Sequence, residues 1–183
     1  ELPSWAVPRA WGQAPEGRTR NTPREYFGGD LDGVRAHLDH VGDLGADVLY
    51  MTPVFPAEST HRYDASSFDE VDPLLGGDRA LTDLIAESHR RGIRVIGDIT
   101  LNHCGRKHDW FVRAQDPQTP EREFFRFDPD LPYGYECWFN VPTLPKFDHT
   151  SAGLREALVA SADSPVRAWL RGPDGLDGWR VDV

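Results

Sequence analysis

Apolar residues recur along the chain first at helical spacing and then in short continuous runs. Between residues 31 and 44 the spacing is helical, with Asp30 at the expected N-cap and Gly45 where a helix would end. Residues 47–55 then form a mostly apolar run closed by prolines, which predicts a strand buried on both faces. The pattern therefore opens with a helix followed by a strand.

The helix and strand pattern is repeated further along the chain. Asp78 is the expected N-cap of a helix that leads to a second strand over residues 93–101, and Thr150 or Ser151 begins helices that lead to a third strand at 178–183. This order is typical of a parallel α/β sheet with right-handed crossovers. A (β/α)₈ barrel has about 250 residues, so we expect this 183-residue chain to be a truncated part of one.

Two stretches of the chain show no regular spacing of apolar residues. Residues 1–29 are rich in Pro, Gly, Trp and Arg and predict an irregular entry loop. Residues 104–149 are aromatic and Pro-rich, and they exceed an ordinary strand-to-helix connection. We therefore expect barrel over 1–103, an inserted subdomain over 104–149 and barrel again over 150–183.

Composition and charge narrow the class of partner. The chain is 39% hydrophobic and 27% charged, which is typical of a globular domain. Its net charge of -10 opposes nucleic acid or an anionic membrane as a partner. Six tryptophans and nine phenylalanines can bind flat apolar faces, which sugar rings present. No apolar run is long enough to span a bilayer.

The two cysteines, Cys104 and Cys137, are too few for a disulfide framework, although the sequence leaves one bridge between them open. Cys104 follows His103, but the spacing of Cys and His is not that of a zinc site. An unligated thiol is the favoured interpretation of Cys104.

Polar residues gather where the predicted strands end, which is where barrel enzymes hold their reactive groups. They are His61, Arg62, Tyr63, Asp64, Asp98, Asn102, His103, Arg180 and Asp182. Arg180 and Asp182 lie two apart on a strand, so they face the same side, and the cation would keep the carboxylate ionised. Each group also has a structural interpretation: an ordinary ion pair for these two, core packing for Tyr63, and a hydrogen-bonding role for Asp98.

Three motifs in order decide between these interpretations. GDITLNH at 97–103 and DGWRVDV at 177–183 resemble two signatures of the α-amylase family, glycoside hydrolase family 13. LPKFD at 144–148 resembles a motif of its neopullulanase-like and cyclomaltodextrinase-like members. The resemblance covers residues 26–183, with Cys104 and Asp148 as departures from the residues usual in the family.

The resemblance implies roles for the strand-end residues. Asp182 corresponds to the nucleophile of a covalent glycosyl-enzyme, and Arg180 to the residue that orients it. His61 and Tyr63 correspond to positions that line the sugar subsite beside the scissile bond, and His103 to a histidine that binds a hydroxyl of that sugar.

The remaining positions receive supporting roles. The resemblance assigns Asp98 to support of the site and Asn102 to a position that binds calcium in some members, with no cofactor required. Asp64 is expected near sugar hydroxyls. The strands then correspond to the second, third and fourth of the barrel, with the first upstream of Glu1, and residues 104–149 to domain B.

The sequence thus predicts a retaining glycosidase that cleaves α-glucosidic bonds in α-glucans or maltooligosaccharides and is cytoplasmic. Such an enzyme needs a second carboxyl group about 5 Å from the nucleophile. The family supplies it from the fifth strand, neither Asp64 nor Glu136 is assigned to it, and we expect the chain by itself to be inactive. The alternatives are an isomaltulose synthase-like or trehalose synthase-like glycosyltransfer enzyme and a non-catalytic carbohydrate-binding relative. A phosphate-binding barrel is opposed by the charge.

Overall fold

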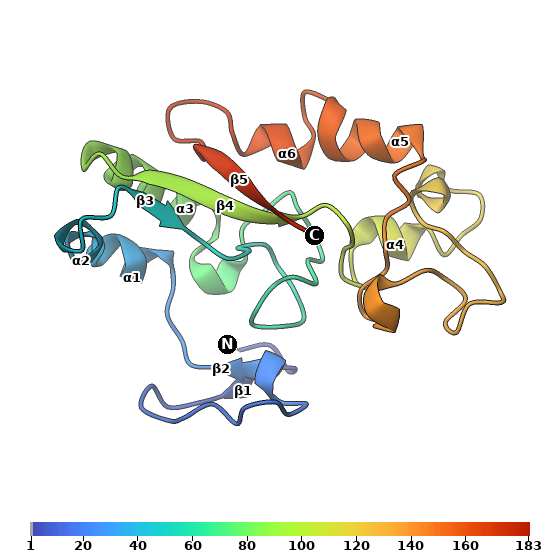
Figure 1. Cartoon of the computed structure of the whole chain (residues 1–183), viewed down its shortest axis with the longest axis horizontal. Helices are drawn as coiled ribbons and strands as arrows, with labels where there is room; N and C mark the ends of the chain where they lie inside the picture. The colour runs from blue at the N-terminus through green and yellow to red at the C-terminus, as the bar shows by residue number, and fades with distance from the viewer. Residues whose placement is uncertain (1) are drawn as a thin grey trace.

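Three parallel strands form the central sheet of the computed structural model, which describes residues 2–183 (Figure 1). In sheet order they are β3, Val48–Tyr50, β4, Arg94–Thr100, and β5, Gly178–Asp182. Each parallel pair is joined by a crossover that contains helices. The chain therefore has the predicted α/β architecture of a partial (β/α)₈ barrel.

Within residues 2–183, six short or medium helices accompany this sheet. Before β4 they are α1, Leu31–Ala36, α2, Leu38–Asp43, and α3, Gly77–Arg90. After β4 they are α4, Asp109–Arg113, α5, Ala152–Arg155, which continues as a π-helix over Glu156–Ala160, and α6, Pro165–Ala168. Short 3₁₀ turns cover Thr22–Arg24, Pro73–Leu75, Pro120–Phe124 and Trp138–Asn140.

Two hydrophobic clusters hold the elements together. The first packs α1 and α3 against β3 and β4, with Leu84 and Val95 fully buried. The second is rich in phenylalanine and is formed largely by residues 104–149, together with residues such as Phe55 from the segment after β3. Trp169 and Trp179 pack against both clusters, so residues 104–149 and the sheet share one continuous interior.

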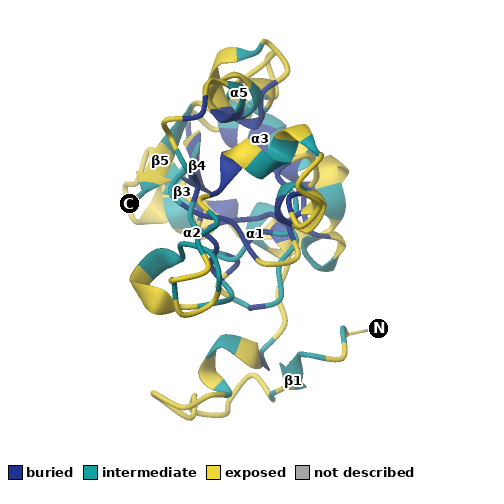
Figure 2. Ribbon diagram, turned by 90° about the vertical axis from the view of Figure 1, so that its right-hand side faces the viewer, coloured by how far each residue is buried: buried dark blue, intermediate teal, exposed yellow. Residues whose placement is uncertain are grey.

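An N-terminal arm precedes this body. Its strands β1, Val7–Pro8, and β2, Glu25–Tyr26, pair in parallel, which the sequence pattern does not predict. Apart from these strands and the 3₁₀ turn at Thr22–Arg24, the arm is irregular, as expected. The arm carries mostly intermediate and exposed residues, whereas the buried residues gather in the body (Figure 2). None of the helices in residues 2–183 has the length and hydropathy that crossing a bilayer requires.

The helix predicted after Asp30 is interrupted. Asp30 is its N-cap, accepting the N–H of Gly33 at 2.7 Å, as expected. At His37 the backbone leaves the helical region and separates α1 from α2. The N–H of His37 donates to Val34, while its ring Nδ1 bonds the Gly33 carbonyl at 2.8 Å, so the side chain takes the acceptor that a continuous helix would use.

The strand predicted over residues 47–55 is shorter than expected and is not buried on both faces. β3 has three residues, of which Val48 is 38% and Tyr50 47% exposed. The first cluster covers the face of β3 that carries Leu49, whereas Tyr50 points to the opposite face. The two-sided burial predicted for this strand is therefore wrong.

Asp78 does not cap α3. The helix begins at Gly77 with Gly76 as N-cap, and Asp78 instead accepts the N–H of Val71 at 2.7 Å from within the first turn. Ser151 does cap α5, accepting the N–H of Leu154 at 3.0 Å.

Candidate active site

The ends of β4 and β5 bring two carboxylates onto one guanidinium. Asp98 is paired with Arg180 and Thr100 with Asp182 in the parallel register, so Asp98, Arg180 and Asp182 share one face of the sheet. Nη1 of Arg180 donates to Oδ2 and Oδ1 of Asp98 at 3.0 and 3.2 Å, and also to Oδ1 of Asp182. The two carboxylates, Asp182 first, raise the pKa of Arg180.

Asp98 is 1% exposed, so its charge needs partners inside the protein. Besides Arg180, the hydroxyl of Tyr63 donates to Oδ2 at 2.9 Å, and the hydroxyl of Tyr50 donates to the same oxygen. The hydrogen bond to Asp98 raises the pKa of Tyr50, whereas burial first, and then the same carboxylate, raises that of Tyr63. The sequence pattern does not single out Tyr50, although it is the one tyrosine of an otherwise apolar run.

The loop after β3 presents His61, Tyr63 and Asp64. The backbone N–H of Tyr63 donates to Nδ1 of His61 at 3.1 Å, which leaves Nε2–H as the donor of that ring. The two rings are stacked with centroids 5.8 Å apart. Ser59, which the sequence pattern also leaves out, donates from its hydroxyl to Oδ1 of Asp64. The loop thus holds its three predicted site residues in one turn.

Arg62, between His61 and Tyr63, fixes the shape of this turn from inside. Its backbone is in the left-handed region with φ of 58°. Nε donates to Oδ2 of Asp72 at 3.0 Å in a buried ion pair, and Nη1 donates to the carbonyl of Thr60 at 3.0 Å. The buried pair therefore anchors the strained turn that projects the neighbouring rings.

His103 links this loop to the inserted segment. Its Nε2–H donates to the carbonyl of Tyr63 at 3.1 Å, so Nδ1 is the acceptor for the side-chain amide of Asn102 at 3.2 Å. The ring of Trp138 stacks on it with centroids 5.3 Å apart. Burial lowers the pKa of His103, which favours a neutral ring. A sugar hydroxyl bound by His103, as the resemblance implies, would have to replace or share one of these partners.

The calcium position that the resemblance implies for Asn102 stays a prediction. Within residues 2–183 no group of three or more His, Cys, Asp or Glu side chains comes together as a metal site would require. The side-chain nitrogen of Asn102 donates to His103. Cys104 and Cys137 are free thiols, so the bridge that the sequence leaves open is not formed, and burial raises the pKa of Cys104.

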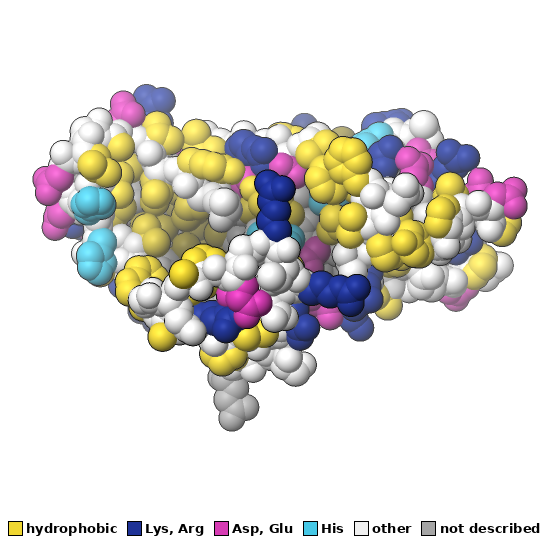
Figure 3. Space-filling model, turned by 60° about the horizontal axis from the view of Figure 1, so that its bottom comes forward, with side chains coloured by type: hydrophobic (Ala, Val, Ile, Leu, Met, Phe, Trp, Pro, Cys, Tyr) yellow, Lys and Arg dark blue, Asp and Glu magenta, His cyan; other side chains and the backbone are white. Residues whose placement is uncertain are grey.

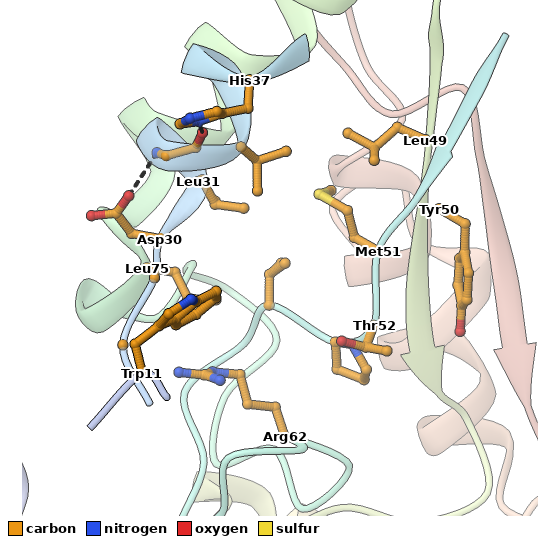
Figure 4. A pocket seen from close by; sticks show the side chains of 16 residues that line it. Trp11, Asp30, Leu31, His37, Leu49, Tyr50, Met51, Thr52, Arg62 and Leu75 are labelled. Atoms are coloured by element: carbon orange, nitrogen blue, oxygen red, sulfur yellow. Dashed lines mark hydrogen bonds between the residues drawn. The ribbon is translucent and has the colours of Figure 1, made fainter. Parts of the chain in front are cut away.

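A pocket of about 750 Å³ lies on the other side of β3 from this cluster. Figure 3 shows a hollow in the surface lined by hydrophobic side chains, and Figure 4 shows the pocket from close by. Leu49 and Met51 point into it, whereas Tyr50 points away toward β4 (Figure 4). Tyr50 and Arg62 are among the residues that line this pocket, whereas Asp98, Arg180 and Asp182 are not.

The amino-acid sequence is matched by a known family model. The model described as alpha amylase, catalytic domain, matches residues 9–183, which include every residue of the cluster. The chain belongs to the α-amylase family. This confirms the family that the three motifs indicate.

Several members of the α-amylase family are similar in sequence to nearly all of this chain. A cyclomaltodextrinase from Geobacillus thermopakistaniensis is 35% identical to this chain, and the match covers 94% of this chain and 30% of the relative. Neopullulanase 2 from Thermoactinomyces vulgaris is also 35% identical, and the match covers 86% of this chain and 27% of the relative. Among solved structures, the cyclic alpha-maltosyl-(1-->6)-maltose hydrolase from Arthrobacter globiformis has a TM-score of 0.83 at 35% identity, covering 100% of this chain and 40% of that one. The chain thus spans about a third of the length of such relatives.

Proposed function

We propose that this chain carries the nucleophile of a retaining hydrolase of α-glucosidic bonds, with Asp182 in that role. The observation that carries the proposal is the shared guanidinium of Arg180, which links Asp182 to the buried Asp98. A charge-assisted hydrogen bond from a cation orients a carboxylate. The names of the relatives support an α-glucan substrate, since they include a cyclomaltodextrinase and a maltogenic alpha-amylase.

The reaction uses Asp182 first as a nucleophile. Arg180 binds Oδ1, and we assign the attack on the anomeric carbon to the other oxygen, Oδ2. A bond forms from Oδ2 to that carbon as the bond to the leaving oxygen breaks, and water later attacks the same carbon and releases Asp182. The group that protonates the leaving oxygen, and that later takes the proton of the attacking water, is assigned to no residue of this chain.

His61, Tyr63, Asp64 and His103 are proposed to line the sugar site. The stacked rings of His61 and Tyr63 offer an apolar face to a pyranose ring, and Nε2–H of His61 is a donor for a hydroxyl. Residues 104–149 are proposed as domain B, whose Trp138 closes the side at His103. The cytoplasmic location, the inactivity of the chain by itself and the glycosyltransfer alternative stay predictions.

The test is hydrolysis of maltooligosaccharides, pullulan and cyclomaltodextrins by the protein encoded by the full gene. Asp182→Asn is expected to keep the fold and lose nearly all turnover, and the first sugar released by the wild type is expected to keep the α configuration by NMR. Asp69→Asn, an exposed carboxylate, is the matched control and should stay active. Activity of Asp182→Asn within tenfold of the wild type, a barrier change of only about 1.4 kcal/mol, would contradict the assignment.

A further inference from the structure

Tyr50, on β3, donates its hydroxyl to the buried carboxylate of Asp98, on the neighbouring strand β4. In the β3 to β4 register Tyr50 is paired with Ile96, which precedes Asp98 by two residues on the same face. Tyr63 reaches the same carboxylate from the loop that follows β3, thirty-five residues away from Asp98 in sequence. Oδ2 of Asp98 thus accepts one phenol hydroxyl from the strand and another from the loop.

Three donors therefore meet on a single oxygen. Tyr50, Tyr63 and Nη1 of Arg180 all donate to Oδ2 of Asp98. The same nitrogen of Arg180 also holds Asp182, so the guanidinium is divided between a buried carboxylate and the proposed nucleophile. How strongly Asp98 attracts Arg180 then depends on how much of its charge the two phenols already compensate.

We propose that Tyr50 is a positioning residue of the active site, acting on Asp182 through Asp98 and Arg180. The inference rests on the proposed function of Asp182. Without the Tyr50 hydroxyl, Oδ2 of Asp98 has one hydrogen-bond donor fewer, so less of its charge is compensated. Arg180 is then attracted more strongly to Asp98 and moves away from Oδ1 of Asp182. The rings of Tyr63 and His61 stay in place, so sugar binding is preserved while the nucleophile loses its orientation.

The experiment compares Tyr50→Phe with the wild type in the protein encoded by the full gene, with Tyr26→Phe as control. Tyr26 also donates its hydroxyl once, to the carbonyl of Leu74 at 3.4 Å, far from the cluster. For Tyr50→Phe we expect kcat to fall about tenfold with KM within twofold, a barrier increase of about 1.4 kcal/mol. Tyr26→Phe is expected to keep both constants. If Tyr50→Phe does not fold, Tyr50→Leu, which also lacks the hydroxyl, takes its place.

A double-mutant cycle with Asp98→Asn distinguishes positioning from a general loss of stability. Because Tyr50 acts through Asp98, its removal is expected to have little further effect on kcat in the Asp98→Asn background. A Tyr50→Phe kcat within twofold of the wild type, equal losses in KM, or full additivity with Asp98→Asn would overturn the inference. An inactive wild-type protein would instead overturn the proposed function.

Discussion

At the scale of single residues, the site depends on how one buried charge is compensated. The sequence predicted that Arg180 and Asp182 face the same side, because residues two apart on a strand do so. It also predicted that Asp98 needs a partner. It did not predict that the partner of both carboxylates is the same nitrogen, because the register between β4 and β5 decides which residues meet. The sequence did not predict the role of Tyr50 either, because its contact with Asp98 depends on the pairing of β3 with β4.

Tyr63 has a ring and a hydroxyl that are expected to act separately. Tyr63→Ala removes the stacking face and should weaken sugar binding by about 1 to 3 kcal/mol, by analogy with stacking of bases on aromatic side chains. Tyr63→Phe keeps the face and removes only the hydrogen bond to Asp98, so KM should change little while kcat falls. Steady-state kinetics on one maltooligosaccharide checks both variants. Equal KM values for Tyr63→Ala and the wild type would contradict the stacking role.

The buried ion pair of Arg62 is expected to contribute more to the free energy of unfolding than an exposed ion pair does. Arg62→Ala leaves the buried carboxylate of Asp72 without its cation, at a cost of about 3 to 5 kcal/mol. Arg35→Ala breaks only exposed pairs, with Asp32 and with Asp83, and should cost less than about 1 kcal/mol. Urea denaturation of both variants measures the difference in free energy of unfolding. A similar cost for the two would show that the buried pair contributes little.

At the scale of elements, the helix and strand order and the caps at Asp30 and Ser151 were predictable, whereas the element lengths and the start of α3 were not. The order follows from hydrophobic spacing, which is local information. The break at His37 arises from a side chain that competes for a carbonyl, and Asp78 is drawn from its cap position to the N–H of Val71. The exposure of Tyr50 depends on what covers each face of β3. These features depend on contacts that spacing does not encode.

Gly97 on β4 allows the close approach of the α6 to β5 region. A Cβ there would lie 2.6 Å from Cζ3 of Trp179 and 2.8 Å from Cδ1 of Leu176. Gly97→Ala is therefore expected to destabilise the protein by about 1 to 3 kcal/mol, since overpacking forces these side chains to move. At Gly178, on the neighbouring strand, an added Cβ meets no described atom within 4 Å, so Gly178→Ala should stay within about 0.5 kcal/mol. Thermal unfolding of the pair gives the comparison.

At the scale of the whole molecule, a buried histidine makes stability depend on pH. His108 is 3% exposed, and burial, followed by the charge of Arg113, lowers its pKa to about 3. Nδ1 accepts the N–H of Trp110 and caps α4. In the unfolded chain the ring takes up a proton below about pH 6.5. The unfolded state therefore binds more protons between pH 6.5 and 3, and stability should fall as pH drops through that window.

Denaturation midpoints measured from pH 7 to pH 4 check this expectation. His108→Asn keeps an acceptor at the cap position but does not titrate, so its stability should fall less steeply with pH than that of the wild type. His40→Asn, exposed on α2, is the matched control and should keep the wild-type slope. Parallel curves for the wild type and His108→Asn would assign the pH dependence to other groups.

The cluster around Asp98 also has a consequence for the order of folding. The hydrogen bonds of Asp98 span long stretches of the chain: Tyr50 is 48 positions away in sequence and Arg180 is 82 positions away. The helix α3, in contrast, forms from residues that are neighbours in sequence. Contacts that close long loops are slow to form because the chain must first lose the entropy of the intervening segment. The cluster is therefore expected to assemble after the helices. Substitutions in it should then accelerate unfolding more than they slow folding.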